Sequence, residues 1–416
     1  MSRKGKKVCH LCGRDESQVP VMLEGMDIYL CSDCINSAYD ILKQMGYANT
    51  SASQHPEGRN AAVPSLQEIP KPVEIKKYLD EYVIGQDAAK RHLSVAVYNH
   101  YKRLHNTYAA NAEVEIEKSN IILIGSTGTG KTLLARTIAN LLNVPFTIVD
   151  ATVFTEAGYV GEDVESILSR LLQAADYDKE RAEQGIVFID EIDKIARKSD
   201  NPSITRDVSG EGVQQSLLKL LEGSVVNVPP KGGRKHPDQD YVQVDTRNIL
   251  FICGGAFDGI ERKIALRLNK HAIGFDKLGK AKNLSDSEEL ISHIAPSDLR
   301  AFGLIPEIIG RLPVVTSLSP LDRNALQRIL REPRNSLIKQ YQELFRLDGI
   351  KLTFEEAALD FVVDKAMEFK LGARGLRSIM ESIMTTAMFN APSSKKKNYV
   401  ITLEYAQKEF DQNYRN

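Results

Sequence analysis

Continuous apolar runs alternate with helically spaced apolar positions through the middle of the chain. The runs at 120–124, 185–189 and 248–253 contain almost no polar side chains, which is typical of strands covered on both faces of a parallel sheet. Helical spacing between these runs predicts crossover helices. We therefore expect an α/β fold with a doubly wound core.

After residue 320 the pattern changes to helices with few strands. Apolar spacing, capping residues and proline positions predict helices at 321–330, 333–345, 355–369 and 374–389 and strands at 350–354 and 399–403. These elements predict a small α+β lid domain over 319–416, which follows a hinge near 317–321.

A glycine-rich segment separates the apolar run at 120–124 from a helical segment that starts near Leu133. It matches the P-loop pattern G-x4-G-K-[ST] in the strand–loop–helix context that this motif requires. Backbone N–H groups of such a loop wrap phosphates, Lys131 reaches the β- and γ-phosphates, and the Thr132 hydroxyl ligates Mg²⁺. The predicted nucleotide contacts are Gly125, Ser126, Thr127, Gly128, Thr129, Gly130, Lys131, Thr132 and Leu133.

An acidic pair follows the apolar run at 185–189. Asp190 at the strand end is predicted to hold Mg²⁺, and Glu191 is predicted to polarise the attacking water. The predicted reaction is nucleotide hydrolysis, with Lys131 and Glu191 as catalytic residues. Because the hinge near 317–321 lies close to the nucleotide, hydrolysis can become a relative rotation of two domains.

Composition narrows the class of protein. The chain has 416 residues, 42% of them hydrophobic, which is enough for two to four domains with their own cores. With 54 basic against 55 acidic residues, there is no overall attraction to nucleic acid or anionic lipid. No apolar stretch has the length of a signal peptide or a membrane span, so we expect a cytoplasmic protein without nucleic acid or membrane partners.

Four of the five cysteines fall in the first 34 residues, as two Cys-x2-Cys pairs separated by 18 residues. Cys9, Cys12, Cys31 and Cys34 can supply the four thiolates of a structural Zn²⁺ site with no open coordination position. The alternative is two redox-active or merely buried pairs. His10 lies inside the first pair and is interpreted as a neighbour of the metal rather than a ligand, and the fifth cysteine, Cys253, as buried and inert.

The cysteine pairs belong to a predicted recognition module over 1–46. Short strands are expected at 19–23 and 28–30 and a helix at 35–45. A polar, small-residue stretch over 47–64 is predicted to be a flexible tether, and 65–318 is predicted to be the large ATPase domain. Zinc modules of this kind bind nucleic acid about as readily as protein, so this module does not identify its own ligand.

Together these motifs resemble the ClpX family of AAA+ protein unfoldases, from the cysteine pairs to the C-terminus. The resemblance implies a homohexamer that uses ATP, Mg²⁺ and one Zn²⁺ per subunit to pull substrate proteins through a central pore. It also implies adaptors and the ClpP peptidase as partners. One departure is Ser126, where family members commonly have proline, but this is a free position of the P-loop pattern.

The resemblance assigns further residues to the nucleotide. Val83 and Ile84 correspond to apolar contacts of the adenine base, and Arg374 to the sensor-2 arginine. Arg311 corresponds to the arginine finger, which enters the nucleotide site of a neighbouring subunit and is counted among the catalytic residues.

The resemblance also assigns loops to substrate and peptidase. Tyr159 and Val160, flanked by glycines, correspond to the pore loop that grips polypeptide, and 206–213 to a lower pore loop. The pore-entrance residues are Arg234, Lys235 and His236, and the ClpP-docking residues are Ile273, Gly274 and Phe275.

Two other functional classes stay open at this point. A DNA-processing AAA+ ATPase, such as a helicase or clamp-loader relative, would carry a basic surface with interleaved aromatic residues. A nucleotide-dependent binding scaffold would switch without turnover, and Glu191→Gln would change it little.

Overall fold

A computed structural model of the chain describes residues 7–24, 28–35, 37, 69–107, 114, 116–155, 162–197, 210–229, 241–270, 290–394 and 396–413. Its internal contacts divide the chain into two units, Met1–Ala62 and Val63–Asn416. Each unit is described by itself. The domain limits expected after residues 46, 64 and 318 stay predictions.

The first unit contains a short antiparallel hairpin. Strand β1 (Met22–Glu24) pairs with β2 (Tyr29–Cys31), preceded by the 3-10 turn η1 (Glu16–Gln18). Both strands were expected, and each lies slightly later than predicted. Most of the helix predicted at 35–45 lies outside the described residues.

The second unit is built on a five-stranded parallel sheet. Its strands are β3 (Ile121–Ile124), β4 (Phe146–Asp150), β5 (Ile186–Asp190), β8 (Leu250–Gly255) and β9 (Val314–Ser317), in the order β4-β5-β8-β3-β9. The three predicted runs are confirmed as β3, β5 and β8. Strands β4 and β9 form the two edges and were not predicted.

Both faces of the central strands are covered, which explains their uninterrupted apolar sequence. In β3, Ile121 and Leu123 belong to one hydrophobic core, and Ile122 and Ile124 belong to the core on the opposite face. Successive strand residues point to opposite faces, so each strand supplies both cores.

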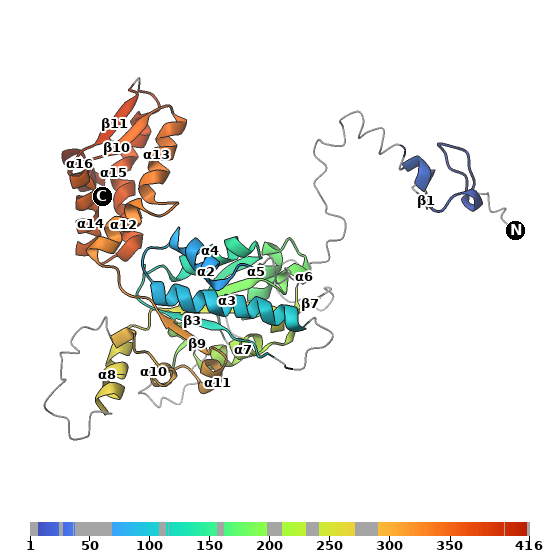
Figure 1. Cartoon of the computed structure of the whole chain (residues 1–416), viewed down its shortest axis with the longest axis horizontal. Helices are drawn as coiled ribbons and strands as arrows, with labels where there is room; N and C mark the ends of the chain where they lie inside the picture. Colours follow the sequence, from blue (N-terminus) through green and yellow to red (C-terminus); the bar gives the residue numbers. More distant parts are fainter. Residues whose placement is uncertain are drawn as a thin grey trace. The chain divides into compact units, whose positions relative to one another are not determined.

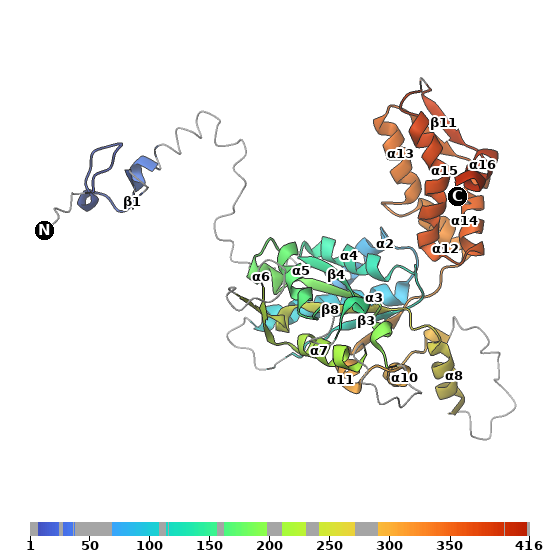
Figure 2. The same cartoon turned by 180° about the vertical axis from the view of Figure 1, so that it is seen from behind.

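Different helices cover the two faces of the sheet (Figures 1 and 2). One face carries α2 (Pro72–Asp80), α3 (Asp87–Thr107) and α4 (Lys131–Leu142). The core on the other face is built with residues of α5 (Ser166–Ala174), α7 (Glu211–Glu222), α10 (Pro296–Phe302) and α11 (Pro306–Gly310), and of α8 (Ile260–Lys270), which packs against α10. The remaining elements are η3 (Ala151–Val153), α6 (Lys179–Ala182), η4 (Ile192–Ile195), η5 (Thr246–Asn248) and the antiparallel pair β6 (Val225–Val228) and β7 (Val242–Asp245).

The C-terminal part has its own hydrophobic core, built from five helices around a two-stranded parallel sheet (Figures 1 and 2). The helices are α12 (Arg323–Arg331), α13 (Leu337–Leu347), α14 (Glu356–Glu368), α15 (Gly372–Asn390) and α16 (Leu403–Asn413), and the strands are β10 (Lys351–Phe354) and β11 (Asn398–Ile401). The α+β class is confirmed. Helix α16 was not predicted.

One predicted helix start is wrong. The helix expected to open at Pro333 begins at Leu337, because the Ser336 side chain accepts a hydrogen bond from the Lys339 N–H and caps it. Pro333 instead belongs to a turn, in which its carbonyl accepts the Ser336 N–H at 3.0 Å. The Ser336 side chain satisfies a backbone N–H of the first helical turn, whereas Pro333, three residues earlier, has no side-chain acceptor to do so.

Strand register places the segments that carry the predicted nucleotide and Mg²⁺ residues at one edge of the sheet. Ile124 at the end of β3 lies opposite Gly255, and Ile189 of β5 lies opposite Cys253. The segments that follow β3, β5 and β8 therefore leave the sheet at the same carboxyl edge, where ligands bind in open α/β sheets. Among the helices described, none is both long and apolar enough to cross a membrane.

Candidate nucleotide site and metal site

The P-loop joins β3 to α4, and its backbone requires glycine. Gly128 and Gly130 have φ angles of +84° and +104°, in the left-handed region that side chains rarely adopt. The Lys131 ammonium donates to the carbonyl oxygens of Gly125, at 2.5 Å, and Ser126, at 3.1 Å. Burial lowers the pKa of Lys131, and nearby carboxylates oppose that shift. The lysine is thus held inside the loop it is predicted to serve.

The two predicted Mg²⁺ ligands are adjacent. The Thr132 hydroxyl donates to Asp190 Oδ2 at 3.1 Å. Octahedral Mg²⁺ with bonds of about 2.1 Å separates neighbouring ligand oxygens by about 3 Å. The donor pair therefore fits this ion, bound directly or through its water shell.

Glu191 is held in an uncommon backbone conformation directly after β5. Its φ of +55° is left-handed, and its N–H donates to Asp190 Oδ1 at 3.0 Å. The following turn is fixed by Asp193, which accepts the Ala256 N–H at 3.1 Å and lies 3.3 Å from the Lys194 ammonium. Strain of this kind persists where the surrounding structure holds it, typically at functional sites.

These residues open into a cavity of about 570 Å³, a size typical of sites for cofactors and nucleotides. The predicted residues that line it are Thr127, Gly128, Gly130, Lys131, Thr132, Leu133, Asp190, Glu191 and Arg374. Four basic side chains face a space suited to a polyphosphate: Lys131, Lys194, Arg374 and Arg377.

The P-loop and the start of α15 approach each other through two glycines. A Cβ on Gly372, whose φ is +57°, would lie 3.2 Å from the Thr127 carbonyl oxygen, and a Cβ on Gly128 would lie 3.3 Å from the Ala373 nitrogen. The absence of side chains at both positions lets the backbones touch. The helix that carries Arg374 therefore begins directly against the P-loop.

Several predicted residues lie outside this cavity. Gly125, Ser126 and Thr129 belong to the loop but do not line it. Val83 and Ile84 border a separate cavity of about 300 Å³, although a Cβ on Gly130 would lie 3.9 Å from Val83. Their predicted contact with adenine stays a prediction.

Arg311 lies directly after α11 and also does not line the cavity. Its half-exposed guanidinium pairs with Glu222, with Nη2 at 3.1 Å and Nε at 3.3 Å from Oε1. The predicted action of Arg311 on a neighbouring subunit stays a prediction.

Sequence reasoning missed other residues that line the cavity. Tyr82 precedes the predicted adenine contacts, Asp193 and Lys194 follow the acidic pair, and Arg377 lies one turn after Arg374. The spacing of Arg374 and Arg377 on one helix face was a usable signal. No sequence signal indicated that Tyr82 lines the cavity, because its place there depends on the folding of distant segments.

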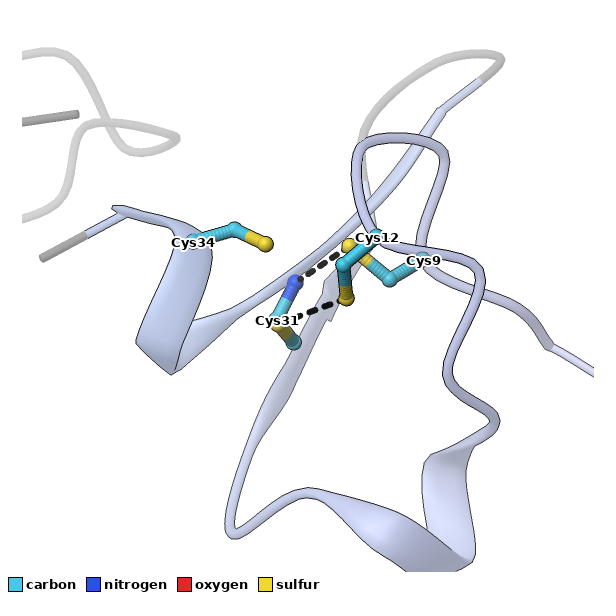
Figure 3. A group of neighbouring side chains, drawn as sticks. All are labelled: Cys9, Cys12, Cys31 and Cys34. Atoms are coloured by element: carbon cyan, nitrogen blue, oxygen red, sulfur yellow. Dashed lines mark hydrogen bonds between the residues drawn. The ribbon is translucent and has the colours of Figure 1, made fainter. Parts of the chain in front are cut away.

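The four N-terminal cysteines converge, with their side chains directed toward one another (Figure 3). Their Sγ atoms all lie within 4.8 Å of one another, and Cys12 and Cys31 are 3.6 Å apart. Tetrahedral Zn²⁺ with Zn–S bonds of about 2.3 Å separates its sulfurs by about 3.8 Å. The donor set thus fits a structural zinc ion.

Hydrogen bonds favour the thiolate form, which zinc requires, at Cys9 and Cys12, whereas side-chain hydrogen bonds with Cys12 and Cys31 raise the pKa of Cys34 to about 12. Burial raises the pKa of Cys9, but backbone hydrogen bonds from Cys12, Cys31 and Leu11 outweigh it and lower that pKa to about 6. Arg14 lowers the pKa of Cys12 through its backbone and through its guanidinium, whose Nε lies 3.4 Å from the sulfur.

His10 and Cys253 have the surroundings expected of them. His10 Nδ1 accepts the Tyr29 N–H at 2.9 Å, so this nitrogen is hydrogen-bonded to strand β2 of the hairpin. Cys253 is fully buried in β8, and burial raises the pKa of its thiol to about 12.

The predicted substrate and peptidase contacts lie outside the described residues. They are Tyr159, Val160, Arg234, Lys235, His236, Ile273, Gly274 and Phe275. Of the predicted lower pore loop, 210–213 are described, and Glu211 opens α7.

Three families match successive parts of the chain. The ClpX C4-type zinc finger matches residues 7–44, the AAA domain (Cdc48 subfamily) matches 116–315, and the C-terminal, D2-small domain of ClpB protein matches 321–403. With the parallel sheet, the P-loop and the acidic pair at its edge, these matches define an AAA+ ATPase with an N-terminal zinc finger.

Similar proteins identify the family within the AAA+ ATPases. An "ATP-dependent Clp protease ATP-binding subunit ClpX" of Bacteroides thetaiotaomicron is 65% identical over 409 residues, 98% of this chain and 97% of the relative. Proteins of the same name from Bacteroides fragilis and Porphyromonas gingivalis are 64% and 61% identical, over 99% and 97% of this chain and 97% and 96% of theirs. The chain belongs to the ClpX family.

Proposed function

We propose that this protein is an ATP-dependent unfoldase that threads substrate proteins through the pore of a homohexamer and delivers them to the ClpP peptidase. The observation that carries the proposal is the composition of the nucleotide cavity. The P-loop, the Asp190–Glu191 pair and Arg374 come from two separately packed parts of one chain. A change at the phosphates is therefore felt by both parts, as a motor requires.

Each residue of the cavity has a distinct task in this proposal. Lys131 leaves the carbonyl oxygens of its own loop to bind the β- and γ-phosphates, and Arg374 binds phosphate from the side of α15. Thr132 and Asp190 would hold Mg²⁺, which would neutralise phosphate charge when bound. Glu191 takes the proton of the attacking water.

A second subunit completes the site in this proposal. Arg311 is half-exposed and does not line the cavity of its own subunit, so its guanidinium can exchange Glu222 for the nucleotide of a neighbour. A guanidinium placed there stabilises the charge of the transferring phosphoryl group. A ring of subunits follows from this requirement.

The substrate path is proposed from family membership. Tyr159 and Val160 grip the polypeptide, Arg234, Lys235 and His236 attract a substrate tail that ends in a carboxylate, and Ile273, Gly274 and Phe275 dock on ClpP. Relatives named as the ATP-binding subunit of Clp protease support this assignment. The zinc module recognises substrates or adaptors, and the protein acts in the cytoplasm.

A folded fluorescent reporter with a recognition tag tests the proposal. ATP should abolish its fluorescence when the full-length protein is present, and added ClpP should convert that loss into degradation. Glu191→Gln should bind ATP and leave the reporter folded. Reporter fluorescence that survives ATP and the wild-type protein, over a panel of tags, would refute unfoldase activity.

Tyr159→Ala separates gripping from hydrolysis. We expect it to hydrolyse ATP but to unfold the reporter at least about tenfold more slowly, because packing against substrate is lost. Tyr177→Ala is the matched control, because Tyr177 is an exposed tyrosine of the same domain that does not line the nucleotide cavity. It should unfold the reporter at the wild-type rate. Unfolding by Tyr159→Ala at the wild-type rate would disprove the grip.

A further inference from the structure

Helix α7 connects two places that the proposed mechanism treats separately. It lies between η4, which follows Glu191, and the α10–α11 segment, which leads to Arg311. Its apolar face is buried in the core on that side of the sheet. Two buried amide side chains lie at opposite ends of this helix. Gln214 belongs to its start and Asn120 contacts its last turn, and both also contact the segment that ends at Arg311.

Gln214 makes the connection near the start of α7. Its side chain is completely buried, and its Nε2 donates to the carbonyl oxygens of Ile195, at 2.8 Å, and Gly303, at 3.3 Å. Its Oε1 accepts the Ile305 N–H at 2.8 Å. One amide thus fixes the last residue of η4, the end of α10 and the start of α11.

Asn120 makes the connection at the other end of α7. It is buried at the start of β3, and its Nδ2 donates to the carbonyl oxygens of Leu221, at 3.1 Å, and Arg311, at 2.9 Å. The next residue of α7 is Glu222, whose carboxylate pairs with the Arg311 guanidinium. Asn120 therefore holds side by side the two backbone segments that carry this ion pair.

A buried amide that satisfies several backbone groups is costly to replace, since each group left unpaired opposes the arrangement. Gly303 adds a second close contact, because a Cβ there would lie 2.4 Å from the Arg197 carbonyl oxygen. The arrangement leaves α7 little freedom relative to η4 or α11.

We infer that Gln214 and Asn120 are positioning residues. They fix the position of Arg311, which one subunit presents to its neighbour, relative to the Asp190–Glu191 segment of the same subunit. The inference rests on the proposed action of Arg311 between subunits. Through α7, a displacement that starts at Glu191 reaches Ile195 and Gln214, and then the start of α11 and Arg311. Neither amide lines the nucleotide cavity.

Steady-state ATP hydrolysis by the full-length protein, without any protein substrate, tests the inference. Gln214→Met and Asn120→Leu should each lower kcat about tenfold and change KM for ATP by less than about twofold, as should Arg311→Ala. Gln215→Met is the matched control, since its side chain lies on the exposed face of the same helix. It should keep the wild-type kcat.

Double variants distinguish positioning from general destabilisation. Because both residues act through Arg311, Gln214→Met should lower kcat by less than about twofold in an Arg311→Ala background. Losses that multiply to about a hundredfold would overturn the linkage. Wild-type kcat in Arg311→Ala would instead overturn the role of Arg311 between subunits, and the linkage with it. If Gln214→Met does not assemble, Asn120→Ser, which keeps a hydrogen-bonding group, carries the same test.

Discussion

Alanine at Gly372 should weaken nucleotide binding through the contact between α15 and the P-loop. The φ of +57° is left-handed, where a side chain costs about 1–2 kcal/mol. The new Cβ would also lie 3.2 Å from the Thr127 carbonyl oxygen. A rearrangement of the turn at Gly372 would relieve both the backbone strain and the close contact, but it would also withdraw Arg374 from the cavity. Since 1.4 kcal/mol is a tenfold change in affinity, we expect the Kd for ATP to rise about 5- to 30-fold.

Titration with a fluorescent ATP analogue measures this change. The Glu191→Gln background prevents hydrolysis during the titration. Gly349→Ala is the matched control: its φ is +72°, and no atom lies within 4 Å of the position of its Cβ. It imposes a similar backbone strain on the turn between α13 and β10, far from the P-loop in sequence. Its Kd for ATP should stay at the value of the background.

Two results would refute the reasoning. An unchanged Kd in Gly372→Ala would mean that the contact with Thr127 contributes nothing to binding. An equal rise of Kd in Gly372→Ala and Gly349→Ala would mean that general strain in the small domain, rather than the contact, lowers affinity.

Three further predictions test the chemistry and the packing. Glu191→Gln should keep its affinity for ATP within about twofold, but should lower kcat by at least about a hundredfold in a phosphate-release assay. Chelation of zinc should expose the four N-terminal cysteines to iodoacetamide, as counted by mass spectrometry. Cys253 should stay unlabelled in the native protein, because burial raises the pKa of its thiol to about 12; its labelling before unfolding would contradict the packing of β8. Asp298→Ala should lower the free energy of unfolding in urea by about 2–3 kcal/mol, since it removes both 2.9 Å hydrogen bonds to Arg267 and the cap of α10. A change below about 0.5 kcal/mol would show that the pair contributes little.

The strands differ in how well the sequence predicts them, for a physical reason. Strands β3, β5 and β8 are covered on both faces, so their positions before Asp190 of β5 and the glycines of β8 are all apolar and the runs are conspicuous. Strands β4 and β9 form the edges, and their residues alternate or mix buried with half-buried positions. Thr147 in β4 and Thr316 in β9 interrupt the apolar pattern without disturbing the fold.

Parts of the site also differ in how well the sequence predicts them. The P-loop and the Asp190–Glu191 pair are predictable because each is a local motif whose spacing is fixed by one turn of chain. The contact of Gly372 with Thr127 joins residues almost 250 positions apart, and no local pattern reports it. Tyr82 was missed for the same reason, since the cavity it lines forms when distant segments fold together.

The described residues also narrow the hinge predicted near 317–321. Leu318 donates its N–H to the Ile124 carbonyl oxygen at 2.7 Å, which extends the pairing of β9 with β3. Ser319 is held by Gln86, which accepts its N–H at 2.8 Å and donates to its carbonyl oxygen at 2.7 Å. Leu321 already packs on the C-terminal core. Rotation between the two parts must therefore use the bonds around Pro320, whose ring fixes φ and leaves few torsions free to carry the motion.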